Sequence, residues 1–247
     1  MGERQPAFNI PASVAGLLGL IAAVHVLRKV LPPETDIWLL YVLAFIPARY
    51  GPAGADLPGG AIADLTSPVT YLLVHGDLMH LVVNSVWMLA FGSAVARRVG
   101  NGRFLVFSIY CGIAGALTHL ALHAGETVPV VGASAAISGQ MGGALRILFG
   151  ARYSVSLAGE SLATVELRPL LHTLLNPRML VFIAIWTAIN LLFGLGYLSF
   201  GGGDAAIAWE AHIGGFLAGL LGFGWFDRRS PHPPGGMTVR PHDEGPG

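Results

Sequence analysis

The sequence predicts an all-α membrane protein with six spanning helices, and its composition and charge pattern carry that prediction. The 247 residues are 53% hydrophobic and only 11% charged, whereas about a quarter of the residues in a typical soluble domain are charged. The charges lie between long neutral windows instead of recurring along helix faces. Six windows can each supply the ~20 apolar residues that a spanning helix needs. The expected helices cover residues 10–31, 78–97, 104–124, 133–150, 179–199 and 205–226 of a membrane domain 1–229, and residues 230–247 form a Pro/Gly-rich, disordered cytoplasmic tail.

The basic residues give the orientation. With the N-terminus inside, only Arg28, Lys29 and Arg49 of the 14 lysines and arginines fall in outer segments. This distribution follows the positive-inside rule. Because six spans return the chain to the side where it began, we expect both termini in the cytoplasm of a multi-pass protein in the cell (inner) membrane.

The outer segment between the first two helices, residues 34–74, is not uniformly polar. Residues 37–45 are aromatic and apolar but too few to span a bilayer, so we expect them to lie in the interface or to re-enter partway. The following Pro/Gly-rich run, residues 47–60, indicates a loop.

The second and third helices each carry a polar pair at helical spacing. His80 and Asn84 share one face, which should point into the protein because polar groups are costly against lipid. Hydrogen bonding between helices is the alternative role for this pair. His119 and His123 suggest a metal or haem, but no further His, Cys or carboxylate completes a ligand set at helical spacing. We therefore expect no metal and no cofactor.

A candidate nucleophile begins the fourth helix. Ser134 follows Gly132 and Ala133 where a loop enters an apolar helix, so its hydroxyl would lie beside free backbone N–H groups. A helix cap or a tight helix crossing explains such a serine equally well. In the sixth helix, Gly215 and Gly219 form a GxxxG pair that favours a close crossing with the fourth helix.

That crossing would bring His212 beside Ser134. Counting 1.5 Å per helical residue places His212 and Asn84 roughly 10 Å below the outer surface, with His80 about one turn shallower. Agreement in depth indicates a water-accessible site that opens outward. In this site His212 would take the proton of Ser134, while Asn84, His80 and a backbone N–H would stabilise the oxyanion.

We expect a Ser-His dyad without a carboxylate. Glu210 is two residues from His212, about 200° around the helix, and so faces elsewhere. Asn190, in the fifth helix, is interpreted as a packing hydrogen bonder.

The motifs His75–His80 with Asn84, Gly132–Ala135 and Ala211–Gly215 together resemble the rhomboid intramembrane serine proteases. The resemblance implies a nucleophile at Ser134, a base at His212 and oxyanion donors at His80 and Asn84. It also implies an outer loop that rests partly in the membrane, and substrates that are single-span membrane proteins in a bilayer, with no metal, cofactor or nucleic acid. Supporting roles fall to His75, Gly132, Ala133 and Gly215. Oligomeric state is left open.

Several positions depart from the family pattern. Ala135 stands where many members have glycine. Ser138 replaces a tyrosine that in some bacterial members stacks on the base, so His212 would be held by Trp209 or by another group. The usual Trp-Arg pair of the outer loop is absent, with Thr66-Ser67 at about that place.

Two other functions remain open. A non-catalytic rhomboid-like binder of membrane proteins would need neither Ser134 nor His212. A small transporter with a histidine proton relay should show internal repeats, and the two halves of the sequence show none.

Overall fold

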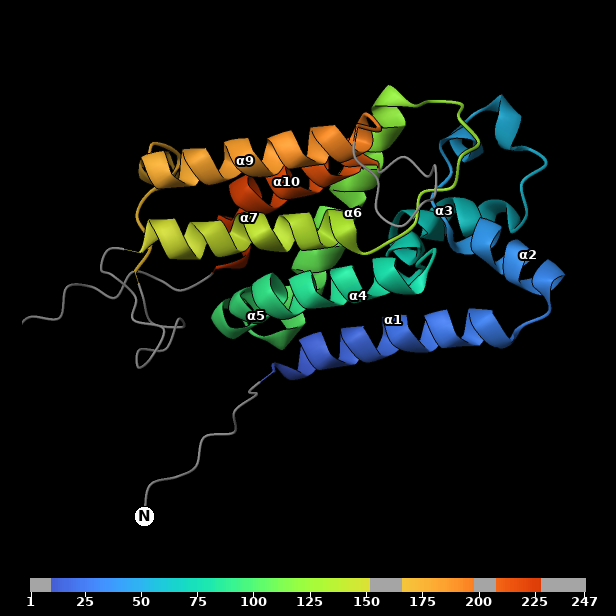
Figure 1. Ribbon diagram of the computed structural model, residues 1–247, viewed down its shortest axis with the longest axis horizontal. Coiled ribbons are helices and arrows are strands. Elements are labelled where there is room, and N and C mark those ends of the chain that lie inside the picture. The colour runs from blue at the N-terminus through green and yellow to red at the C-terminus, as the bar shows by residue number, and fades with distance from the viewer. Residues whose placement is uncertain (1–9, 152–165, 198–207, 228–247) are drawn as a thin grey trace, which may run out of the picture.

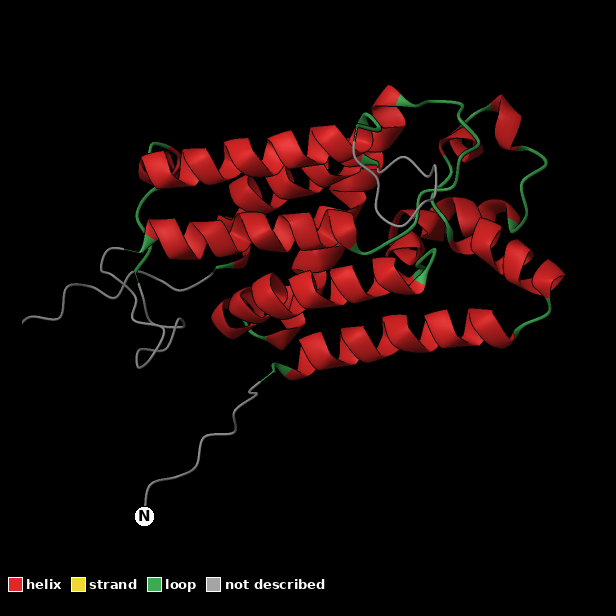
Figure 2. Ribbon diagram, viewed as in Figure 1, coloured by secondary structure: helices red, strands yellow, loops and turns green. Residues whose placement is uncertain are grey.

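The computed structural model describes residues 10–151, 166–197 and 208–227, and no β-strand occurs in these ranges. Figures 1 and 2 show long, roughly parallel helices, with the shorter helices α2 and α3 gathered at one end. The predicted fold class, an all-helical membrane bundle, is confirmed. The long elements are α1 (Ala12–Val30), α4 (Leu78–Trp87) continued through a π-helical turn (Met88–Gly92) into α5 (Ser93–Val99), α6 (Asn101–Leu122), α7 (Ser134–Gly150), α9 (Pro177–Gly194) and α10 (Trp209–Phe226).

Two expected helix ends are wrong. Helix α9 ends at Gly194 instead of residue 199, because the chain turns at Gly196, whose φ is +78°. Helix α10 begins at Trp209, so His212 is its fourth residue. Residues 205–207 and the expected tail, 230–247, lie outside the described residues.

Four helical stretches of the described chain are long and apolar enough to cross a membrane: α1, α4 with α5, α6 and α9. Their outward faces leave large apolar side chains exposed, among them Val30, Val86 and Ile185. Helix α7, with 17 residues, is one residue shorter than the shortest of these four, and α10 carries the polar side chains of Glu210 and His212 near its start. Most residues of α7 are buried, so it does not need an apolar surface all round, whereas α10 exposes Leu217, Leu221 and Trp225 on one side.

Glycines let α7 and α10 cross closely. A methyl group on Gly219 would overlap the backbone of Gly139, and one on Gly215 would overlap the backbone of Ala135. The GxxxG pair therefore packs against α7 as the sequence predicted. Backbones that approach this closely leave no space for side chains between them.

The outer segment contains more helix than expected. Helix α2 covers Pro33–Leu43, and α3 covers Gly60–Thr70, in part of the segment that the sequence analysis left without structure. Short helical turns at Pro47–Tyr50 and Pro52–Gly54 lie between α2 and α3, and another at Tyr71–Leu73 follows α3. Elsewhere in the chain, the short helix α8 (Leu170–Leu174) precedes α9.

Two buried arginines hold this segment in place. Arg28 binds Asp36 through its Nε at 2.6 Å and donates to the His75 carbonyl at 3.1 Å. Arg49 donates to the Tyr41 carbonyl at 2.8 Å and pairs with Asp64 at 3.3 Å. These contacts anchor the loop in a chain that lacks the usual Trp-Arg pair.

The α7–α10 crossing gives a direct prediction. Gly219→Ala should destabilise the protein by about 1–3 kcal/mol because the added methyl group forces the two backbones apart. Gly224→Ala is the matched control, since a methyl group on Gly224 meets no atom within 4 Å. Thermal unfolding in detergent should show a lower midpoint for Gly219→Ala alone, and equal midpoints would contradict the close crossing.

Candidate active site

The loop before α7 places Ser134 at the end of the bundle where α2 and α3 lie. Phe45 and Val130 exchange two backbone hydrogen bonds, at 3.0 and 2.8 Å, and the Gly132 N–H donates to the Tyr71 carbonyl at 3.0 Å. Gly132 has a φ of +118°, which strains any other residue. The outer segment therefore fixes the backbone that leads to Ser134.

Ser134 is the first residue of α7, and its half-buried side chain meets His212 from α10. The Nε2 atom of His212 lies 2.8 Å from the Oγ of Ser134. Since Ser134 starts the helix, its backbone N–H has no partner within α7 and faces the loop side.

Asn190 of α9 contacts the other side of the His212 ring. Its Oδ1 lies 2.7 Å from His212 Nδ1, and its Nδ2 donates to the Trp186 carbonyl at 2.9 Å. The second bond settles the amide orientation, so Oδ1 accepts the Nδ1–H of the imidazole. His212 Nε2 then carries the lone pair and faces Ser134.

The sequence predicted Asn190 as a hydrogen bonder between helices but did not predict that its partner is His212. Of the two supports expected for His212, Trp209 or another group, the structure has the second, Asn190, while the Trp209 side chain packs against Gly194. The available signal was an amide in an otherwise apolar span, which must face a polar partner in the protein.

His80 and Asn84 flank Gly132, two residues before Ser134. A methyl group on Gly132 would come within 2.7 Å of the His80 ring and 3.6 Å of Asn84 Nδ2. Asn84 is 4% exposed, and its Nδ2 has no hydrogen-bond partner among the described residues. Buried amides are normally paired, so this one is free to donate to a group that enters the site.

Asp77 and His75 position His80. The Asp77 carboxylate caps α4 by accepting the His80 backbone N–H at 2.8 Å. The ring of His75 meets the ring of His80 edge to face, with centroids 5.0 Å apart. The neighbours of Ser134 in the sequence are also buried, namely Ala133, Ala135 and Ser138, so Ser134 lies in a closely packed part of the protein.

Comparison with known proteins agrees with this arrangement. The family model of the rhomboid domain matches residues 63–230. This chain belongs to the rhomboid family. A curated relative, the rhomboid protease GluP of Bacillus subtilis (strain 168), is 27% identical over 153 residues, which are 62% of this chain and 24% of GluP. The chain thus spans about a quarter of that relative's length. Family membership and the apolar helices identify a multi-pass membrane protein of an intramembrane protease family.

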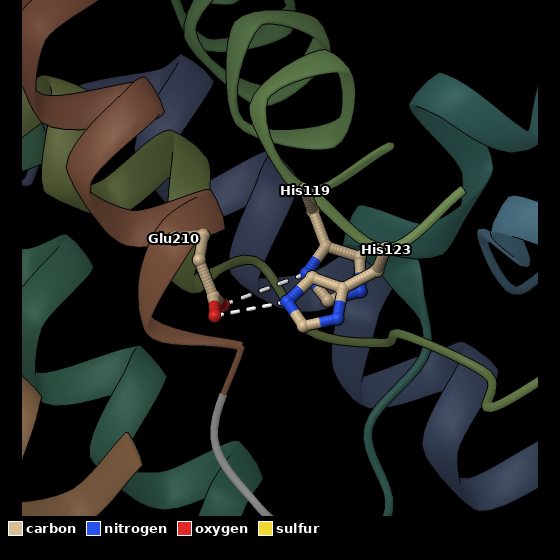
Figure 3. Close-up of side chains that lie close together, drawn as sticks. All are labelled: His119, His123 and Glu210. Atoms are coloured by element: carbon tan, nitrogen blue, oxygen red, sulfur yellow. Dashed lines mark hydrogen bonds and ion pairs between the residues drawn. The ribbon is translucent and has the colours of Figure 1, made fainter. Parts of the chain in front are cut away.

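Glu210 lies apart from the Ser134–His212 pair of this rhomboid protein, as the sequence analysis expected. Its carboxylate lies 2.9 Å from His123 Nε2 and 3.6 Å from His119 Nδ1 (Figure 3). A carboxylate therefore does join the histidine pair, but it comes from another helix, which residue spacing along α6 could not show.

His75 makes the fold sensitive to acid. The side chain is fully buried in the loop before α4, and burial, together with the neighbouring His80, lowers the pKa of His75 to about 4. The unfolded chain, with an ordinary histidine pKa near ~6.5, binds a proton that the folded chain excludes. The stability that His75 contributes is therefore present above pH ~6.5 and is lost as the pH falls toward 4.

His75→Phe should reduce this acid sensitivity. The wild type should lose about 3 kcal/mol more than the variant between neutral pH and pH ~4, following the pKa difference. Thermal midpoints in detergent across this pH range measure the difference. Parallel curves for the two proteins would show that His75 does not titrate as described.

Proposed function

We propose that this rhomboid-family protein is an intramembrane serine endopeptidase that works through Ser134 and His212. The observation that carries the proposal is the 2.8 Å hydrogen bond between Ser134 Oγ and His212 Nε2. A non-catalytic binder has no use for a serine hydroxyl that donates to an oriented imidazole.

In the proposed mechanism, His212 Nε2 takes the hydroxyl proton while Ser134 Oγ attacks the carbonyl carbon of the scissile bond. The tetrahedral intermediate collapses as the imidazolium gives that proton to the leaving amine. Water, deprotonated by the same imidazole, then hydrolyses the acyl-enzyme. Asn190 holds the Nδ1–H of His212 in place during both steps. The aspartate of a Ser-His-Asp triad orients its histidine in the same way.

The developing oxyanion would accept hydrogen bonds from Asn84 Nδ2, the His80 ring and the Ser134 backbone N–H. The unpartnered, buried amide of Asn84 supports this role. A donor that already points at the site costs no reorganisation in the transition state and is worth about 3 kcal/mol.

The proposed substrates are single-span membrane proteins, cleaved in or near the membrane. An intact helix keeps its carbonyl groups hydrogen bonded, so the substrate must unwind locally before Ser134 reaches one. We further propose the inner membrane as the location, both termini in the cytoplasm and a site that opens to the outer side. A membrane domain of residues 1–229 with a tail of residues 230–247 completes this proposal.

Ser134→Ala and His212→Ala should each abolish cleavage of a model transmembrane substrate by purified protein in detergent or lipid. Ser134→Ala removes the hydroxyl that attacks the substrate, and His212→Ala removes the imidazole that accepts the hydroxyl proton. Gly224→Ala serves as a control for handling and reconstitution. Undiminished cleavage by Ser134→Ala would exclude the mechanism.

Asn190→Ala should lower kcat on the order of 10- to 1000-fold, with little change in KM, because the imidazole loses its orientation and not its contact with substrate. Asn190→Asp, which keeps the acceptor, should recover part of the rate. Thr187→Ala, one turn away on α9, is the control. A loss confined to KM, or no recovery with aspartate, would assign Asn190 to packing.

Asn84→Ala should lower kcat on the order of 10²- to 10³-fold while leaving the Ser134–His212 bond intact. Steady-state kinetics on the same substrate measure the loss. Full activity in this variant would remove Asn84 from the oxyanion site.

A further inference from the structure

Three potential ligands from α6 and α10 converge at a place separate from the Ser134–His212 pair. His119 and His123 lie one turn apart at the end of α6, and Glu210 faces them from the first turn of α10 (Figure 3). One ligand atom from each residue lies within 4.8 Å of the other two. The set forms only when α6 and α10 pack together.

The donor set is the one that zinc prefers. Two histidines and one glutamate form a recurrent three-residue zinc site, and tetrahedral bonds of about 2.0–2.1 Å put neighbouring ligand atoms on the order of 3.3 Å apart. The separations from Glu210, 2.9 Å to His123 Nε2 and 3.6 Å to His119 Nδ1, bracket that value. Small rotations of these side chains would thus complete a tetrahedral arrangement.

His119 supplies a second, independent observation that points to a ligand. The residue is 7% exposed, and its Nδ1 has no hydrogen-bond partner among the described residues although it points at the Glu210 carboxylate. A buried ring nitrogen without a hydrogen-bond partner is unfavourable in the folded protein. A cation between His119 and Glu210 would satisfy both groups.

Glu126 orients the second histidine. Its Oε1 lies 2.9 Å from His123 Nδ1, so the opposite nitrogen, Nε2, faces the cluster. Metal-bound histidines commonly have a carboxylate on the second ring nitrogen, which fixes the tautomer and the ring direction. Glu126 thus lies where a residue that orients a metal-binding histidine is expected.

We propose that His119, His123 and Glu210 bind a divalent transition metal ion, best matched by zinc, with Glu126 orienting His123. The ion would leave one position for water, and the partly exposed His123 provides access. It would link α6 to α10 two residues before His212. This inference does not depend on peptide cleavage.

Zinc binding by the untagged, full-length protein tests the proposal directly. After treatment with EDTA in detergent, the wild type should take one equivalent of Zn²⁺ from a chromophoric chelator, and Co²⁺ should give the visible absorption of a four-coordinate site. Glu210→Gln and His123→Ala should bind at least about tenfold more weakly, and Glu126→Gln about 10- to 100-fold more weakly. His172→Ala, an exposed histidine of α8, is the control and should bind as the wild type does.

Thermal unfolding separates loss of binding from loss of fold. Zn²⁺ should raise the midpoint of the wild type and of His172→Ala, but not of Glu210→Gln or His123→Ala. The metal-free midpoints show whether each variant is folded. The proposal would be overturned if the wild type and a folded Glu210→Gln variant bound Zn²⁺ equally tightly. It would also be overturned if Zn²⁺ raised the unfolding midpoints of these two proteins by the same amount. Neither readout uses the protease reaction, so the metal site and the proposed function can fail separately.

Discussion

Backbone contact between α7 and α10 determines where Ser134 and His212 lie. Gly139 and Gly142 on α7 meet the backbone of α10, while Gly215 and Gly219 of α10 meet the backbone of α7. In a bilayer, where apolar surface gains little by leaving lipid, this kind of close packing is a main source of helix association. It also brings the first turns of both helices close enough for a serine and a histidine to share a hydrogen bond. The position of the polar Ser134–His212 pair therefore depends on the glycine-lined contact between α7 and α10.

The remaining helices complete the surroundings of that pair. The outer segment, anchored by Arg28 and Arg49, holds the loop that leads into α7. Helix α4 brings an unpaired amide, Asn84, to the same loop, and α9 brings Asn190 to the imidazole. Each of these polar groups would be costly against lipid, and each faces inward. Membership of the rhomboid family agrees with the helical topology. The contacts of Asn190 and of the two arginines hold the parts of this topology together around the site.

The sequence was sufficient to predict six long helices and the meeting of Ser134 with His212, because charges, apolar windows and the GxxxG pair are local signals. The contact of Asn190 with His212 was not predicted because α9 is apolar all round, so nothing in its pattern shows which side faces His212. The metal-like cluster was missed for a related reason: Glu210 joins His119 and His123 only through packing of α10 on α6. Helix α3 went unrecognised because Gly59 and Gly60 at its start and Pro68 inside it indicate a loop.

The most direct test of the account is to find the residue that an activated serine reagent modifies. Mass spectrometry of the wild type after reaction with a fluorophosphonate should locate a single adduct on Ser134. The His212→Ala variant should remain unlabelled under the same conditions, because the hydroxyl then lacks the base that accepts its proton. Labelling on a different residue, or equal labelling of the two proteins at Ser134, would contradict the proposed dyad.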